Sequence, residues 1–306
     1  MNPEWDVAVA GGANTDYLVR AAQLPQPGET VAGEEFQQAP GGKGANQAVA
    51  AARLGARVLL VARLGTDERG DIVLEALQAN GVDTRYVTRD SEAATGVALV
   101  MVAGEKQIMT APGANMRLSP DNVQAAAAAI AAARVVMLAS EMPTETLLVA
   151  ARLAHDAGVK VVLDPARPKA LPDAVFPLVY AIKPNASEAQ AVTGIQVRDR
   201  DTARRAARWL LERGVQAASV QAGDEGNLLL WHGGACWLPK LPVKSIDATG
   251  AGDAFAAALA VAIAEGRPWE EAGPFANAAA ALTTTVLGAQ AALPTRQAVE
   301  ALLTLS

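Results

Sequence analysis

The stretch RVLLVARLG (residues 57–65), followed closely by DERGDIVLEALQANGV (residues 67–82), decides the fold class. The first part is an aliphatic run that predicts a buried strand, and the second is an amphipathic run that predicts a helix. A strand that leads into a helix is the building unit of mostly parallel sheets, because two parallel neighbours need a crossover connection between them.

The same alternation recurs along the chain. Strands are predicted at residues 5–12, 134–140, 159–165 and 216–223, and helices at about 43–54, 144–158, 187–194 and 201–214. Repeated aliphatic strands separated by helices indicate an α/β fold, a doubly wound and mostly parallel sheet with helices on both faces.

Two segments interrupt this alternation. Residues 15–37 contain prolines and short strand-like pieces, and residues 95–110 have the pattern of a hairpin that turns at Gly104. Both segments predict strands outside the main sheet, which together form a small β-sheet lid over its edge. Because the chain has no clear linker and no internal repeat, we expect residues 1–306 to form a single domain that carries this lid.

The composition is typical of a soluble globular protein. Of the 306 residues 51% are hydrophobic and 19% are charged, and the net charge of −6 argues against a nucleic-acid surface. The start of the chain lacks the pattern of a signal peptide, and no apolar run reaches the roughly 20 residues of a membrane span. With Cys236 as the only cysteine and two histidines, a disulfide and a His/Cys zinc site are not expected. We therefore expect a cytoplasmic protein without nucleic-acid or membrane partners.

The stretch PGGKGANQAVAAARLG (residues 40–55) is glycine-rich and opens a predicted helix. It is not a Walker A loop, because Gly44 follows Lys43 where that loop has Ser or Thr, and it does not fit the dinucleotide-binding fingerprint. What remains is a tight turn at Gly42 that lets a ligand approach the backbone, with Lys43 and Asn46 as polar donors. This pattern suits a polyhydroxyl ligand such as a sugar, and it equally suits a structural turn.

Polar residues also follow the first predicted strand. In GGANTDYL (residues 11–18), Asn14 and Asp16 lie just beyond its carboxyl end, which is where ligands bind in open α/β sheets. The two side chains suit vicinal hydroxyl groups, and the alternative is an Asx-turn that leads the chain out of the strand.

A third polar stretch is IKPNASEAQAVTG (residues 182–194). Asn185 and Glu188 are spaced as in a capping box, with the Asn at the N-cap of a helix and the Glu at its third residue. The functional alternative places the same two residues near phosphate groups and a hydrated Mg²⁺ ion.

The stretch IDATGAGDAFAAALA (residues 246–260) is the most informative for chemistry. A helix that begins near Gly252 directs free N–H groups toward the loop before it, and the glycines leave room for an anion. Asp253 lies at the same helix end, where it can accept a proton from a hydroxyl group. The helix dipole makes the carboxylate a weaker base, but phosphoryl transfer depends more on positioning and charge stabilisation than on a strong base.

In combination, these stretches resemble the ribokinase branch of the PfkB family of carbohydrate kinases, over nearly the whole chain and in the same order. GGKGANQA (residues 41–48) is similar to the first signature of the family and DATGAGDAF (residues 247–255) to its second; QPGET (26–30), TGVAL (95–99), GAN (113–115) and LSP (118–120) also match. The resemblance implies a doubly wound α/β domain with a small β-sheet lid. That lid often forms a dimer clasp, so a homodimer through the lid is expected.

The resemblance also implies roles for individual residues. Asp253 is the expected catalytic base, and Ala248 to Gly252, with Gly250, Ala251 and Gly252 at the helix end, form the expected anion hole. The expected sugar-binding residues are Asn14, Asp16, Gly42, Lys43, Asn46 and Glu141, together with Asp253. On the nucleotide and Mg²⁺ side are Asn185, Glu188, Gly223, Gly226, Gly252 and, near the adenine, Asn277. A monovalent cation, K⁺ in this family, is expected at Asp247, Thr249, Thr283, Val286, Gly288 and Ala292.

The implied activity is the ATP-dependent phosphorylation of D-ribose at its 5-hydroxyl group, which gives ribose 5-phosphate and ADP. A kinase for another sugar or for a nucleoside is the alternative within the same family. Two alternatives from other functional classes remain: a non-catalytic sugar-binding regulator and a nicotinamide-dependent dehydrogenase. The dehydrogenase is disfavoured because no dinucleotide-binding fingerprint follows the first strand.

Overall fold

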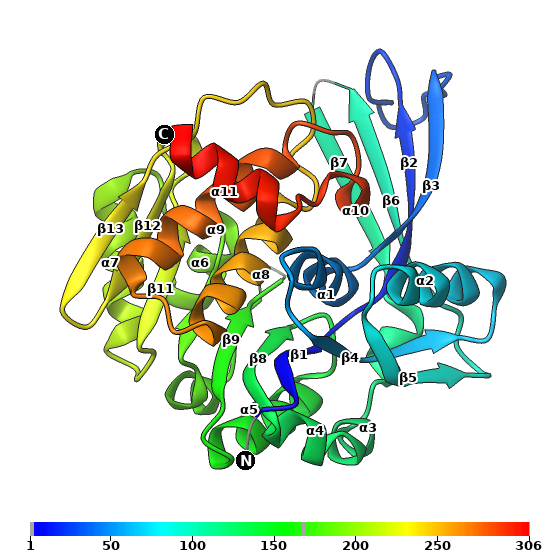
Figure 1. Cartoon of the computed structure of the whole chain (residues 1–306). Helices are drawn as coiled ribbons and strands as arrows, with labels where there is room; N and C mark the ends of the chain where they lie inside the picture. The colour runs from blue at the N-terminus through cyan, green and yellow to red at the C-terminus, as the bar shows by residue number, and fades with distance from the viewer. Residues whose placement is uncertain (1–2, 104, 167–168, 306) are drawn as a thin grey trace.

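The main body is a nine-stranded sheet with helices on both faces, as predicted (Figure 1). The computed structural model describes residues 3–103, 105–166 and 169–305. The spatial order of the strands is β13-β12-β11-β10-β9-β8-β1-β4-β5. Their bounds are β1 Trp5–Ala10, β4 Val58–Gly65, β5 Asp83–Asp90, β8 Ala133–Ala139, β9 Lys160–Asp164, β10 Ala181–Ile182, β11 Ala217–Gln221, β12 Asn227–Trp231 and β13 Gly234–Leu238. All pairs are parallel except β11–β12 and β12–β13 at one edge.

Each face of this sheet has its own hydrophobic core. Along β1, Val7 and Val9 belong to one core while Ala8 and Ala10 belong to the other, because successive side chains of a strand point to opposite faces. One face is covered by α1 (Lys43–Arg53), α2 (Glu68–Ala79), α8 (Ala251–Ala264), α9 (Trp269–Thr283) and α11 (Arg296–Leu305), and the other by α3 (Pro120–Ala125), α4 (Ala127–Ala131), α5 (Thr144–Asp156), α6 (Ala186–Thr193) and α7 (Arg200–Leu211).

A separate four-stranded sheet forms the lid, which stands beside the main body in Figure 1. Its strands are β2 (Asn14–Arg20), β3 (Glu35–Gly41), β6 (Gly96–Ala103) and β7 (Glu105–Ala111), in the order β3-β2-β6-β7. The two segments that interrupt the α/β alternation therefore pair with each other, as predicted. The pairing of β6 with β7 confirms the expected hairpin, whose predicted turn residue Gly104 lies outside the described residues.

The two faces of the lid differ in character. The register places Asp16, Ala98, Val100, Ile108 and Thr110 on the face that borders the cleft described below. The opposite face exposes apolar side chains, of which the most exposed are Val19, Phe36, Leu99 and Met109.

The winding direction of the main sheet reverses between β1 and β8. From β1 the chain proceeds to β4 and β5 on one side, and then returns to β8, β9, β10 and β11 on the other. Such a switch point leaves a crevice at the carboxyl ends of the strands, which is where open α/β sheets bind ligands. The remaining short elements are the helix α10 (Ala289–Ala292) and the 3-10 turns η1 (Gly113–Arg117), η2 (Asp173–Leu178) and η3 (Gly223–Glu225).

Within the described ranges, no helix combines the length and the apolar character that crossing a bilayer requires. The cytoplasmic location and the single-domain organisation stay predictions.

Candidate active site

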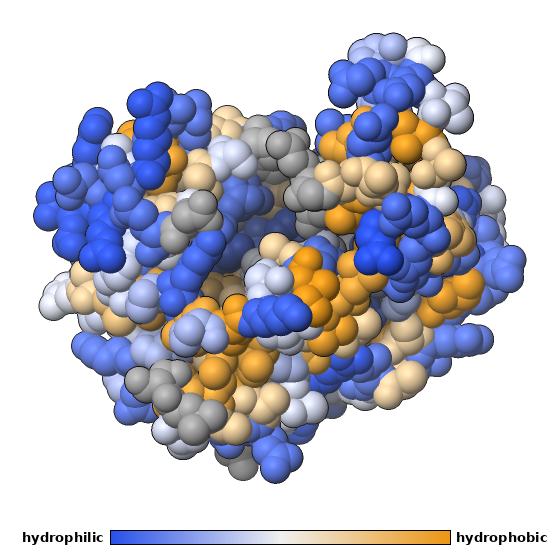
Figure 2. All heavy atoms as spheres, turned by 90° about the horizontal axis from the view of Figure 1, so that it is seen from above, coloured by the Kyte–Doolittle hydropathy of each residue, from blue (hydrophilic) through white to orange (hydrophobic). Residues whose placement is uncertain are grey.

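A cleft of about 480 Å³ lies between the lid and the carboxyl ends of the main-sheet strands. Figure 2, seen from above, shows the hollow between the two parts. The cleft brings together residues from all four of these stretches of the sequence: Asn14, Asp16, Gly42, Lys43, Asn46, Asn185, Glu188 and Ala248 to Asp253 all line it. Glu141, which follows β8, lines it as well. Residues up to about 240 positions apart in the chain thus border one cavity.

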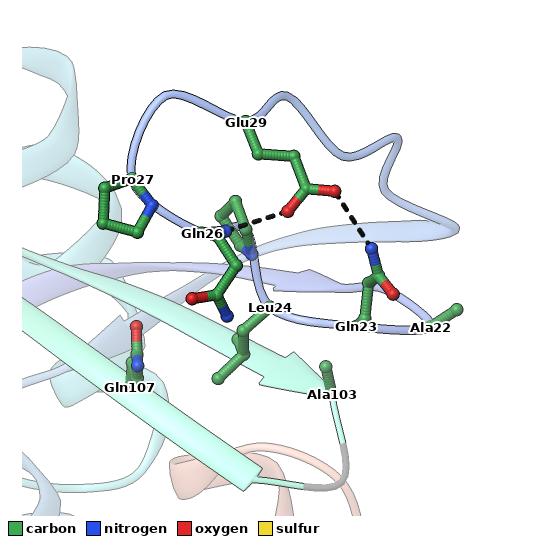
Figure 3. Close-up of a pocket in the computed structure, with 9 residues that line it drawn as sticks. Ala22, Gln23, Leu24, Gln26, Pro27, Glu29, Ala103 and Gln107 are labelled. Atoms are coloured by element: carbon green, nitrogen blue, oxygen red, sulfur yellow. Dashed lines mark hydrogen bonds between the residues drawn. The ribbon is translucent and has the colours of Figure 1, made fainter.

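A larger hollow of about 760 Å³ lies at the far end of the lid, in the loop between β2 and β3 (Figure 3). Glu29 is the only charged residue among those that line it, and its carboxylate accepts hydrogen bonds from Gln26 N and Gln23 Nε2. The Glu29 carboxylate is thus bonded within its own loop, and the residues that line this hollow provide no positive side chain for a phosphate group. The cleft between lid and body, with its lysines and carboxylates, is the better candidate active site.

The N-terminus of α8 forms one wall of the cleft. Gly250 is the N-cap with φ of 82°, a left-handed conformation that favours glycine, and no side chain among the described residues caps this end. Ala251 N donates to Ala248 O at 3.3 Å, whereas no hydrogen bond of Gly250 N or Gly252 N is found among the described residues. Such N–H groups suit an anion, and the anion hole at Gly250, Ala251 and Gly252 stays a prediction.

Asp253 lies in the first turn of α8 and is only 5% exposed. Its Oδ2 accepts a hydrogen bond from Asn46 Nδ2 at 3.0 Å, and its Oδ1 accepts one from Gln47 Nε2 at 3.3 Å. The ammonium group of Lys43 is 3.6 Å from Oδ1. Because α1 supplies all three partners, the packing of α1 against α8 sets the orientation of the Asp253 carboxylate.

Asp164, at the end of β9, is a buried carboxylate in the same network that the sequence analysis missed. It lies 3.2 Å from Lys43 Nζ and accepts hydrogen bonds from Gln47 Nε2 and Ala166 N, both at 2.9 Å. Burial by itself raises its pKa, but Lys43 and Lys183 outweigh burial and hold the pKa below its usual value. Burial likewise lowers the pKa of Lys43, but Asp164 and Asp253 dominate and raise it well above its ordinary value, so Lys43 is charged.

The sugar-side residues are held by a further set of hydrogen bonds. Glu141 follows β8 and its Oε2 accepts the N–H of Lys43 at 2.8 Å. Asn115, which the sequence analysis quoted only within a motif, accepts the N–H of Ala13 and donates to Asn14 Oδ1 at 2.7 Å. Asn115 is 2% exposed, so Asn14 is fixed from within the protein and presents its amide group to the cleft.

Asn185 and Glu188 form the capping box at the start of α6. Asn185 Oδ1 accepts the N–H of Glu188 at 2.9 Å, and Glu188 Oε2 accepts the N–H of Asn185 at 2.8 Å. Both residues also line the cleft, so the capping box does not exclude a functional role, which stays a prediction. Glu188 is 3% exposed, and burial, reinforced by Asp164, raises the pKa of its carboxyl group.

Asp247 fixes the loop that precedes α8. Its Oδ1 accepts the N–H and the hydroxyl group of Thr249 at 2.9 and 2.6 Å, and its Oδ2 accepts the N–H of Gly288 at 2.9 Å. The Asp247 carboxylate thus joins three members of the predicted cation set: Asp247 and Thr249 in the loop before α8, and Gly288 at the start of α10. Of the other three, Thr283 donates its hydroxyl to Ala279 O, Val286 is 45% exposed and Ala292 ends α10, and their part in a cation site stays a prediction.

Of the predicted nucleotide-side residues, Asn277 and Gly226 both lie against the end of β13, at Leu238 and Pro239. Asn277, on α9, donates from Nδ2 to Pro239 O at 2.8 Å and so supports the loop that leads out of β13. Gly226 has φ of 118° and packs so closely that a Cβ would lie 2.3 Å from Leu238 O, whereas a Cβ at Gly223 would meet open space. Their roles toward a nucleotide stay predictions.

Comparison with known proteins agrees with this geometry. Residues 6–296 match the pfkB family carbohydrate kinase model. The chain is 38% identical to ribokinase from Haemophilus influenzae over 293 residues, which cover 95% of this chain and 96% of that one. It is 33% identical to deoxyribokinase from Salmonella typhi over 296 residues, which cover 94% of this chain and 95% of that one. The structure of Arabidopsis thaliana ribokinase complexed with ribose and ATP superposes with a TM-score of 0.89 at 34% identity, covering all of both chains. The chain therefore belongs to the PfkB family of carbohydrate kinases and is a phosphotransferase.

Proposed function

We propose that the protein phosphorylates D-ribose at its 5-hydroxyl group with ATP, giving ribose 5-phosphate and ADP. The observation that carries this proposal is the position of Asp253: a buried carboxylate, held by α1, at the uncapped N-terminus of α8. The relatives support the choice of sugar, since those at 35–38% identity are ribokinases.

The sugar is proposed to bind at the lid side of the cleft. Asn14, Asp16, Lys43, Asn46 and Glu141 supply donors and acceptors for the ring hydroxyl groups, and Gly42 leaves room for them. Asn115 holds Asn14, and the Glu141 carboxylate is held by Lys43 N, so the polar groups are positioned before the sugar arrives.

Asp253 then accepts the proton of the 5-hydroxyl group as its oxygen forms a bond to the γ-phosphorus of ATP. The bond between that phosphorus and the oxygen of the β-phosphate breaks, and ADP leaves with the electron pair. The N–H groups of Gly250, Ala251 and Gly252 stabilise the charge of the phosphoryl group during this transfer.

Asn185 and Glu188 are the residues proposed to hold hydrated Mg²⁺ with the phosphates. The buried Glu188 carboxylate fits this role, because burial and Asp164 both disfavour its charge until a cation arrives. Mg²⁺ bound there neutralises phosphate charge, and it commonly binds through one or two carboxylates together with substrate phosphates. Gly223, Gly226 and Asn277 are proposed on the adenine side.

A monovalent cation is proposed beside the anion hole at Asp247. This carboxylate fits such an ion, since its oxygens already hold Thr249 and Gly288 in the loops before α8 and α10, whose backbone carbonyl groups can supply the other ligands. Omission of K⁺ is then expected to lower turnover.

The choice of sugar is tested by measuring kcat/KM with ATP for D-ribose, 2-deoxy-D-ribose, a hexose and a nucleoside, with NMR identification of the phosphorylated carbon. The proposal predicts the highest kcat/KM for D-ribose and phosphate on carbon 5. A preference for 2-deoxyribose would assign the protein to the activity of its deoxyribokinase relatives. Sugar binding without ADP formation would instead indicate a non-catalytic regulator.

We also propose that the protein forms a homodimer through the lid. The outer lid face exposes Phe36 (62%) and Met109 (68%), together with Leu99 and Val19, and large apolar patches of this kind mark interaction sites. Light scattering is expected to give twice the chain mass for the wild type, and the chain mass for Phe36→Glu. A monomeric wild type would contradict this proposal.

A further inference from the structure

Two lysines point into the cleft, and they differ in how their charge is balanced. The ammonium group of Lys43 lies between two carboxylates, at 3.2 Å from Asp164 and 3.6 Å from Asp253. Lys183 directly follows β10 and is 6% exposed, yet among the described residues its ammonium group makes neither an ion pair nor a hydrogen bond. A buried charge without a partner is costly, so such a group is retained where a ligand supplies the partner.

The position of Lys183 indicates which ligand group that is. A Cβ added to Gly252 would lie 2.7 Å from Lys183 Nζ, so the ammonium group rests against the first turn of α8. The residues that line the cleft include Lys183, Asn185 and Glu188 as well as Ala248 to Asp253. Lys183 therefore lies beside the start of α8, which no side chain of the described residues caps, and in the same cleft as the carboxylate of Glu188.

The charges around Lys183 also favour an anionic ligand. Glu188 and Asp164 interact electrostatically with Lys183, but neither carboxylate lies within ion-pair distance of its ammonium group. Glu188 is proposed to hold Mg²⁺, and Asp164 is already paired with Lys43. Of the two lysines in the cleft, Lys183 is therefore the one whose ammonium group contacts no carboxylate of the described residues.

We propose that Lys183 is a catalytic residue that binds the phosphoryl group during its transfer, together with the N–H groups of α8. As the bond from the γ-phosphorus to the β-phosphate oxygen breaks, negative charge grows on the phosphate oxygens beside Gly252. The ammonium group donates hydrogen bonds to these oxygens and keeps its own protons, while Asp253 takes the proton of the sugar hydroxyl group. This inference rests on the proposed kinase reaction and adds to it a residue that the anion-hole motif does not contain.

The test compares Lys183→Gln and Lys183→Met with the wild type and with Lys160→Gln. Lys160 begins β9, at the opposite end of the sheet, and its ammonium lies over the ring of Tyr180, so its loss controls for a change of net charge. We expect kcat to fall by about 10²–10³ in both Lys183 variants, with the KM for sugar changed less than about threefold. Lys160→Gln is expected to keep wild-type kcat.

A second readout uses ADP with aluminium fluoride, which mimics the transferring phosphoryl group. We expect the Lys183 variants to lose about 10²-fold or more of their affinity for this complex in the presence of sugar, and less than about tenfold of their affinity for ADP alone. The melting temperature of the unliganded Lys183→Met variant is expected to equal or exceed that of the wild type, because the substitution removes an unpartnered buried charge.

The outcomes distinguish a failure of the proposed kinase function from a failure of the role proposed for Lys183. If wild-type protein phosphorylates no sugar, the proposed function fails. If wild-type protein is active and both Lys183 variants keep kcat within about threefold, the inference about Lys183 is wrong and the kinase assignment stands. A fall in melting temperature without a selective loss of aluminium fluoride binding would assign Lys183 a structural role instead.

Discussion

Gly252→Ala is the substitution that most sharply separates fold from function in this site. Gly252 is the second residue of α8, and its φ lies outside the left-handed range, so alanine can adopt the same backbone conformation. The added Cβ would lie 2.7 Å from Lys183 Nζ, whereas an ordinary contact begins near 3.4 Å. The ammonium group must therefore move by about 0.7 Å, and the methyl group occupies the space through which an anion approaches.

The expected effect follows from these distances. A misplacement of about 1 Å in a catalytic group can cost about 10²-fold in rate, and the loss of one oxyanion donor costs about 10²–10³. We expect kcat to fall by about 10²–10³, which corresponds to about 3–4 kcal/mol of transition-state stabilisation. The fold itself should gain, since Gly→Ala at a compatible helical position stabilises by about 0.4–1 kcal/mol.

The assay is ADP release coupled to NADH oxidation, measured beside thermal unfolding of the same preparations. Gly250→Ala is the matched control, because Gly250 has φ of 82° and its Cβ would lie 3.1 Å from Ala289 Cα. That variant should lose both activity and melting temperature, whereas Gly252→Ala should lose activity alone. A Gly252→Ala enzyme with kcat within about threefold of wild type would refute the role assigned to the start of α8.

Two further predictions concern charge and positioning. Burial raises the pKa of Glu188 in the folded protein, so the folded state disfavours the charged carboxylate. Stability is therefore lost as the pH rises from the ordinary Glu pKa of about 4.3, which applies to the unfolded chain, through the raised pKa of the folded state. Glu188→Gln should therefore melt higher than wild type at pH 7 and equally near pH 4, while losing Mg²⁺-dependent activity; a lower melting temperature at pH 7 would contradict the charge argument. Asn115→Ala removes the donor that holds Asn14 and the acceptor of Ala13 N–H, and it should raise the KM for sugar about tenfold while changing kcat less than threefold; a fall in kcat with unchanged KM would place Asn115 in the chemical step instead.

The parts of the site that could be predicted from the sequence are those whose chemistry is local. Gly250, Gly252 and Asp253 lie within four residues, so a helix start with room for an anion can be recognised before any tertiary structure is known. The capping box of Asn185 and Glu188 is local in the same way.

The parts that were missed depend on topology. Asp164 and Gln47 are 117 positions apart and meet only because β9 ends beside the start of α1. Asp164 and Lys183 each end or follow a main-sheet strand, as does Glu141, which the family resemblance supplied, and strand ends converge at the switch point. The predicted strand at residues 159–165 contained this signal for Asp164, since its last polar residue lies at the carboxyl end of the strand, where open α/β sheets bind ligands. For Lys183 the sequence contains no comparable pattern, because its role depends on the distance to Gly252.

The most direct test of the central claim is the rate of sugar phosphorylation by Asp253→Asn. The substitution keeps the size of a side chain that is buried between Asn46 and Gln47 but removes its ability to accept a proton. With Asp201→Asn, at the exposed start of α7, as the control, we predict a kcat lowered by about 10²–10⁴ with ATP and D-ribose, a melting temperature within a few degrees of wild type and retained sugar binding. Turnover of Asp253→Asn close to that of wild type would contradict the account.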